Sequence, residues 1–150
     1  MMEGSRYISR TGHLSCPPSE VFRFVTDLRN FRQFISSDGN DANNFGEESC
    51  SISFAPVGKI EMGLKEKIEF SKVIYNGKLL GTQEFSMIID IAGKNDSRAE
   101  VVISVIASMN PFVRMMAENY INRFLEMVID EMEKFRGWNH LYEKPTNFAA

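Results

Sequence analysis

The side chains that could do chemistry in this 150-residue chain are few and widely spaced. The two histidines, His13 and His140, lie near opposite ends, and the two cysteines, Cys16 and Cys50, form no C-x-x-C pair. Covalent catalysis needs a nucleophile beside a base, and a structural zinc needs closely grouped thiolates or imidazoles. No S-x-x-K, G-x-S-x-G or H-x-x-x-H pattern and no glycine-rich phosphate loop occurs. The sequence therefore predicts no catalytic residue, no metal site and no cofactor, and favours a protein that is not an enzyme.

Charge and hydropathy restrict the partners. The chain carries 17 basic and 20 acidic residues, and its net charge of −3 argues against nucleic acid as a partner. No apolar run approaches the ~20 residues of a membrane span, so stable membrane insertion is not expected. The first six residues lack the apolar segment of a secretory signal, which favours a cytoplasmic protein with two reduced thiols. The oligomeric state stays open.

Methionine and aromatic side chains offer a different chemistry, the binding of apolar molecules. Methionine is flexible and polarisable, and it is common where a surface must fit varied apolar partners. The pattern predicts a pocket between the last helix and the strands, or else a filled core built from the same side chains. The candidate ligand-binding residues are Met62, Phe85, Met87, Ile103, Met116, Tyr120, Phe124 and Met127.

Two polar groups fall among these apolar positions. The Tyr120 hydroxyl would be a polar handle inside a pocket, or would reach the surface while its ring packs on the core. Glu131 lies in the apolar arc of the last helix, where an ionised carboxylate is costly unless it is paired or hydrated. It would orient a polar ligand group or act as an acid, or it would lie in solvent where the helix projects past the sheet.

The elements that would hold these residues follow from periodicity. Residues 6–16 predict a strand, and residues 17–35 predict two short helices, the second capped by Asp27. Residues 36–49 are polar and predict a loop with a short edge strand. From Cys50 onward apolar residues alternate with a period of two through Met109, as in antiparallel strands. Turns are expected at residues 56–58 and 93–96, and a hairpin turn is expected at Asn76-Gly77.

The last helix has the clearest boundaries. Asn110 is an N-cap residue and Pro111 suits the first helical position, while Gly137 is placed to end a helix near Arg136. Its apolar arc covers about half the circumference, which is wider than the ~100° of a minimal surface helix. Such a helix should lie across a concave surface, followed by a tail over residues 137–150, docked through Trp138 or Leu141.

The element order resembles that of the START-like superfamily, also called SRPBCC or the polyketide cyclase/dehydrase and lipid transport group. Residues 17–35 (PPSEVFRFVTDLRNFRQFI) resemble its opening helices, and residues 109–135 resemble its closing strand-to-helix junction. The CSISF run at residues 50–54 fits a strand of the same fold. The resemblance covers roughly residues 5–136 and implies one α+β domain with a helix-grip fold. In that fold a curved antiparallel sheet of about six or seven strands wraps a long C-terminal helix.

The resemblance also implies an internal cavity for apolar ligands. A non-catalytic carrier or sensor of a lipid, sterol-like, quinone or polyketide-like molecule is the leading interpretation. An enzyme of the cyclase or aromatase type is the first alternative, but it would need several convergent polar groups in the cavity. A protein-interaction module like the Hsp90 co-chaperone domains is the second, and a collapsed interior with an exposed apolar patch would favour it.

Overall fold

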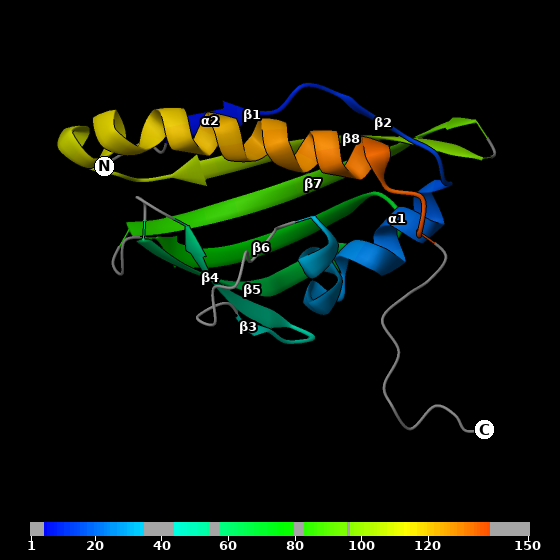
Figure 1. Cartoon of the computed structure of the whole chain (residues 1–150), viewed down its shortest axis with the longest axis horizontal. Coiled ribbons are helices and arrows are strands. Elements are labelled where there is room, and N and C mark those ends of the chain that lie inside the picture. The colour runs from blue at the N-terminus through cyan, green and yellow to red at the C-terminus, as the bar shows by residue number, and fades with distance from the viewer. Residues whose placement is uncertain (1–4, 35–43, 55–57, 80–82, 96, 139–150) are drawn as a thin grey trace.

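The computed structural model describes residues 5–34, 44–54, 58–79, 83–95 and 97–138, in which one long helix lies across a curved sheet (Figure 1). The helices are α1 (Pro18–Val25), the 3₁₀ helix η1 (Leu28–Gln33) and α2 (Pro111–Lys134). The strands are β1 (Ser5–Ile8), β2 (Gly12–Leu14), β3 (Asn44–Phe45), β4 (Ser49–Phe54), β5 (Gly58–Ile68), β6 (Lys72–Leu79), β7 (Gln83–Asn95) and β8 (Arg98–Ala107).

All the strand pairs are antiparallel, in the order β1-β8-β7-β6-β5-β4-β3, and β2 also pairs with β8. This arrangement confirms the predicted α+β helix-grip fold, with eight strands in place of six or seven. The predicted first strand divides in two at Ser9. There the Ser9 backbone N–H donates to the Ile103 carbonyl, and its hydroxyl accepts from the Ile103 N–H.

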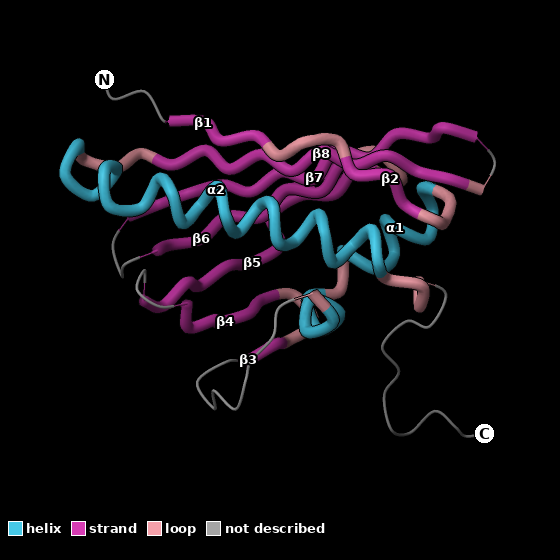
Figure 2. Tube along the Cα trace, turned by 45° about the horizontal axis from the view of Figure 1, so that its top comes forward, coloured by secondary structure: helices cyan, strands magenta, loops and turns pink. Residues whose placement is uncertain are grey.

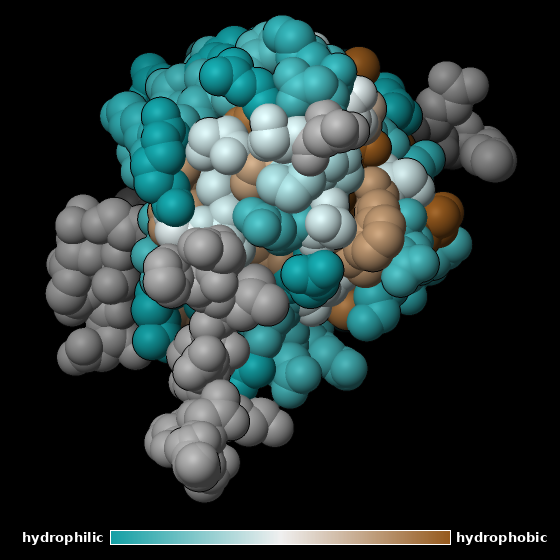
Figure 3. All heavy atoms as spheres, turned by 90° about the vertical axis from the view of Figure 1, so that its right-hand side faces the viewer, coloured by the Kyte–Doolittle hydropathy of each residue, from teal (hydrophilic) through white to brown (hydrophobic). Residues whose placement is uncertain are grey.

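The core lies between the concave face of the sheet, α2, and the α1–η1 pair that closes one end (Figures 1 and 2). Alternate residues of β7 and β8 are buried as their period of two predicts, with Ile89, Val101 and Ile103 almost fully enclosed. Tyr75 on β6 ties the sheet to α1, because its hydroxyl donates to the Val25 carbonyl at 2.6 Å. Seen from the α1 end, the surface is mainly hydrophilic with isolated hydrophobic side chains (Figure 3).

The predicted hairpin turn at Asn76-Gly77 is wrong, because both residues lie within β6. A Cβ atom at Gly77 would come within 2.0 Å of the Glu61 carbonyl oxygen. Glycine is therefore required by the close approach of β5 and not by a turn. The chain instead turns at residues 69–71, where Phe70 has a φ of 63° and packs edge-on against Phe22. Residues 69–71 contain no glycine or asparagine, so the sequence has no local signal for this turn.

Two other predicted turns differ from the structure in part. Strand β7 continues through Gly93 to Asn95, so residues 93–95 extend the strand. Gly58 begins β5, while residues 56 and 57 lie outside the described residues. A bulge between Leu64 and Glu66 then shifts the register of β5. Because a one-residue shift exchanges the two faces of a strand, Ile68 becomes 47% exposed although the alternation predicted it inside.

Both ends of α2 follow local chemistry. The Asn110 side chain accepts the Val113 N–H at 2.8 Å, which confirms the predicted cap. The helix ends at Lys134, two residues before the predicted end. The chain then turns inward, and Trp138 is 2% exposed among the rings of Phe24, Phe34 and Phe135. Trp138 thus packs into the core, which agrees with the predicted docking through this residue, while Leu141 lies outside the described residues.

Asp27 caps η1 as predicted, accepting the Arg29 N–H at 3.1 Å. Part of the predicted loop at residues 36–49 contains the short edge strand β3, and residues 35–43 lie outside the described residues. Within the part of the chain that the structure describes, neither α2 nor a shorter helix has the length and apolarity needed to cross a membrane.

Candidate ligand-binding cavity

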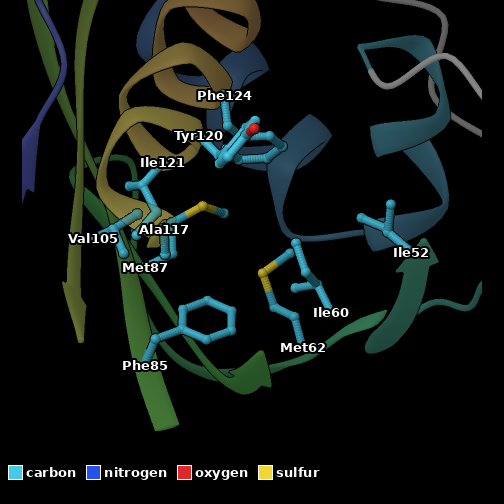
Figure 4. Close-up of a pocket in the computed structure, with 10 residues that line it drawn as sticks. All are labelled: Ile52, Ile60, Met62, Phe85, Met87, Val105, Ala117, Tyr120, Ile121 and Phe124. Atoms are coloured by element: carbon cyan, nitrogen blue, oxygen red, sulfur yellow. The ribbon is translucent and has the colours of Figure 1, made fainter. Parts of the chain in front are cut away.

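An apolar cavity lies between α2 and the concave face of the sheet (Figure 4). Four lining residues come from α2 at helical spacings of three and four, and six come from alternate positions of β4, β5, β7 and β8. The lining residues are Ile52, Ile60, Met62, Phe85, Met87, Val105, Ala117, Tyr120, Ile121 and Phe124. The close-up shows the helix and strand side chains facing one another across the space.

The cavity is narrow. Its free volume is about 50 Å³. Sites for drug-sized ligands measure roughly 300–1,000 Å³, so the space as it stands is far smaller than such a site. A second void of about 20 Å³ lies deeper, between Ile103, Val128, Met132 and the α1–η1 end of the core. Met62, Met87 and Phe124 line both spaces, so movement of these flexible side chains would join them.

Six of the eight candidate residues line these spaces. Five of them surround the larger cavity, namely Met62, Phe85, Met87, Tyr120 and Phe124, while Ile103 lines the deeper void. The structure does not bring the other two there. Met127 is half-buried on the flank of α2, and Met116 is 54% exposed.

The wide apolar arc of α2 predicts that Met116 lines the pocket, but the sheet covers only part of that arc. The buried positions of the helix are Ala117, Ile121, Leu125, Val128, Ile129 and Met132. Of these, Ala117 and Ile121 belong to the cavity wall and were not singled out from the sequence. Both lie within the apolar arc of the predicted helix, near its N-terminus, and that position could have identified them from the sequence.

Polar chemistry is sparse in the cavity. Among the described lining residues, only Tyr120 has a hydrogen-bonding side chain, and none has a carboxylate, amine or imidazole. The Arg123 guanidinium lies over the Tyr120 ring, 5.7 Å from its centroid. Glu131 lies elsewhere, half-buried, with its carboxylate 3.8 Å from the Lys134 ammonium. Tyr120 lines the space with its ring and its hydroxyl adds no polar surface there, so the described wall is suited to apolar contact alone.

The two thiols are poor nucleophiles. Burial raises the pKa of Cys50 to about 12, and burial, with a smaller contribution from Glu20, raises the pKa of Cys16 to about 12. Because the thiolate is the reactive form, both cysteines are protonated near neutral pH and act as small apolar side chains. Cys50 pairs with Met62 across β4 and β5, so the two side chains lie beside each other on the same face of the sheet.

Charged contacts anchor α2 over the core at one end. Arg10, between β1 and β2, contacts Glu126 at 3.1 Å, Glu133 at 3.1 Å and also Asp130. Burial opposes the charge of Arg10, but hydrogen bonds to these carboxylates raise its pKa on balance. The His13 N–H donates to Glu133 at 2.8 Å, and this bond, more than Arg10, lowers the pKa of Glu133. Beneath them, Gly12 lets Ile129 approach closely, since an added Cβ would lie 3.2 Å from it.

The fold is shared with solved structures of low sequence identity. Truncated norcoclaurine synthase from Thalictrum flavum superposes with a TM-score of 0.67 at 8% identity, covering 89% of this chain and 95% of that chain. The protein XoxI from Bacillus cereus gives 0.65 at 10% identity, covering 87% and 94%. An uncharacterised Rhizobium leguminosarum protein gives 0.58 at 16% identity, covering 89% and 95%.

These likenesses extend over nearly the whole of each chain, but identities this low show the fold alone. No protein-family model matches the chain, and no curated protein matches it in sequence. The helix-grip architecture is therefore established by structure, and the function must be argued from the cavity itself.

Proposed function

We propose that this protein binds a small apolar molecule in the cavity between α2 and the sheet, as a non-catalytic carrier or sensor. The observation that carries the proposal is the composition of the wall, in which apolar side-chain atoms of α2 and four strands face one another across the space. Ligand sites are concave and mainly apolar, with a few polar groups that fix orientation.

The free volume of about 50 Å³ bears on the class of ligand. A lipid, sterol or quinone would enter only if α2 or the flexible side chains of the wall moved apart. Three of the wall residues, Met62, Met87 and Phe124, also border the deeper void, so their displacement would lengthen the space toward α1. The proposal therefore includes a wider bound state, made possible by methionine side chains that repack at small cost.

A second candidate, a protein-interaction module, is favoured by the small free volume of the cavity.

The enzyme alternative has one support, a likeness of fold to norcoclaurine synthase, which has a structure in complex with dopamine and hydroxybenzaldehyde. General acid–base catalysis needs positioned titratable groups within reach of the substrate. The described lining residues supply only the Tyr120 phenol, which is why we place the carrier ahead of an enzyme.

Native mass spectrometry of the purified protein, with organic extraction of any bound compound, tests the proposal. Thermal-shift measurements with fatty acids, sterols and quinones accompany it. Ala117→Leu would fill the cavity and should abolish the bound mass and the ligand-induced shift. Asn119→Leu adds the same side chain at an exposed position of the same helix and should change neither.

A stoichiometric apolar ligand that Ala117→Leu removes would establish cavity binding and identify its chemical class. A clean unliganded mass, with no thermal shift from any of the three ligand classes, would contradict the carrier proposal and favour the interaction module.

A further inference from the structure

Exposed apolar side chains gather on the first turns of α2. Phe112 is 67% exposed, Met115 is 73% exposed and Met116 is 54% exposed. Their spacing of three and four residues places them on one face of the helix. We call these three residues the apolar tip. Single exposed apolar residues are ordinary on protein surfaces, but three adjacent large ones form a patch of the kind that marks an interaction site.

The apolar tip adjoins the cavity. The next residue, Ala117, and then Tyr120 and Ile121 line the cavity wall. Figures 1 and 2 both show the start of α2 extending beyond the end of β8, so the tip projects from the molecule. A surface that touched the tip would therefore lie next to one end of the cavity.

Charge distinguishes this part of the helix from the rest. The first half of α2 (residues 111–123) carries Arg114 and Arg123 against one carboxylate, Glu118, for a net charge of +1. The second half (residues 124–134) carries four carboxylates against one lysine, for a net charge of −3. The partial positive charge of a helix N-terminus adds to the first half. The apolar tip thus lies in the cationic half of a helix within an acidic protein.

We infer that the apolar tip docks reversibly on an anionic lipid surface, which attracts the net positive charge of the first half of α2. Apolar side chains beside cations are the combination that binds helices to such interfaces. This inference rests on the proposed function, since it names the surface from which the cavity would receive, or to which it would deliver, its apolar ligand. A second copy of the chain is a poorer fit, because a stable protein interface needs about 800 Å² per partner. Three side chains on one helix turn offer less.

Sedimentation of the full chain with lipid vesicles tests the inference. The protein should bind vesicles made of equal amounts of phosphatidylcholine and phosphatidylserine, and should bind phosphatidylcholine vesicles weakly. The triple substitution Phe112→Ser, Met115→Ser and Met116→Ser should reduce the partition coefficient at least about tenfold, from the apolar area lost. Arg114→Gln and Arg123→Gln should each reduce it about fivefold.

Two matched controls remove an exposed apolar side chain and a cationic side chain away from the apolar tip. Ile68→Ser removes an exposed isoleucine from the turn after β5, and Lys134→Gln removes a cation from the other end of α2. Both should leave vesicle binding unchanged. Because every substituted residue is exposed or at the rim, thermal unfolding should show that all the variants fold.

Equal binding to both kinds of vesicle, or binding unaffected by the triple substitution, would overturn the inference. So would concentration-dependent dimerisation that the triple substitution abolishes while vesicles bind nothing, since the tip would then join two copies. The mass-spectrometric assay separates the two proposals. Retained cavity ligand without vesicle binding refutes only the docking, whereas vesicle binding without a cavity ligand refutes only the carrier function.

Discussion

The two halves of α2 are held in different ways although one continuous helix contains both. The second half buries Leu125, Ile129 and Met132 to within 1% of full enclosure, and its outer carboxylates meet Arg10. Among the described residues, the first half has one polar contact to the N-terminal strands, from Arg114 to the Ser5 hydroxyl at 3.4 Å. Beneath that half lies the cavity.

This difference indicates that the second half of α2 stabilises the fold, whereas the first half leaves space for a ligand. Residues that anchor an element contribute packing and ion pairs, whereas residues over a cavity give up contacts on one side. Local opening is easiest where buried contacts are fewest. We therefore expect the first half of α2 to move when the cavity widens, with the second half remaining in place. Substitutions in the two halves should separate stability from binding.

The largest effect should come from Ile129→Ala. Ile129 is fully buried against Gly12 of β2, and truncating a buried isoleucine costs about 2–5 kcal/mol of unfolding free energy. The matched substitution Met115→Ala, in the exposed first half, should change the unfolding free energy by less than about 0.5 kcal/mol. Urea unfolding followed by circular dichroism measures both. Similar losses for the two variants would break the distinction between the halves.

The sequence predicted the position of α2 correctly but not which of its residues the sheet covers. Asn110-Pro111 is a local signal, because the cap and the first helical turn lie within four residues. The exposure of Met116 depends on where β8 ends relative to the helix, which no local pattern encodes. Six of the eight candidate residues line the two spaces because alternation and helical spacing fix which face each residue occupies.

The errors in the sheet have the same origin. Asn76-Gly77 has the composition of a hairpin turn, yet Gly77 meets a constraint set by Glu61, sixteen residues earlier in the chain. The bulge after Leu64 exchanges the faces of β5, and the only local sign of it is Gly63, directly before the bulge. Phe70 adopts a positive φ that its residue type disfavours, and the packing of its ring on Phe22 accompanies it. Each feature depends on residues far away in sequence.

A moderate effect is expected from Arg10→Gln, which removes the cation that joins three carboxylates of α2. Arg10 is 39% exposed, so solvent screens the pairs, and we expect a loss of about 1 kcal/mol near neutral pH. Arg114→Gln, which removes the hydrogen bond from the first half to the Ser5 hydroxyl, should cost less than about 0.5 kcal/mol. Denaturant unfolding of both variants at low ionic strength makes the comparison. A larger loss for Arg114→Gln would show that the first half is the anchored one.

The Arg10 contacts also predict a direction of pH dependence. The pKa of Glu133 is lowered from its ordinary 4.5 by the His13 N–H and then by Arg10. A lowered pKa means that the ionised carboxylate stabilises the folded state above the ordinary value, and that this stabilisation is lost as the pH falls through the folded-state pKa. Wild-type and Arg10→Gln stabilities should therefore converge as the pH falls below the ordinary 4.5 and through the lowered folded-state pKa. A difference that stays constant through this range would mean that Arg10 acts by packing alone.

The smallest effect should come from Glu131→Gln, and it sharpens the boundary between anchoring and binding. Glu131 lies in the anchored half but outside the Arg10 contacts, and its side chain is 42% exposed beside Lys134. An exposed pair at this spacing contributes little, so the unfolding free energy should change by less than about 0.5 kcal/mol. Ligand affinity and its pH dependence should also stay unchanged, because Glu131 lines neither of the two spaces. A thermal-shift titration of the variant across acidic pH measures this.

If Glu131→Gln weakened ligand binding at neutral pH and not in acid, the bound state would have to extend along the flank of α2 as far as its last turns. The carboxylate would then be a polar end of the site, and the anchored half of the helix would take part in binding.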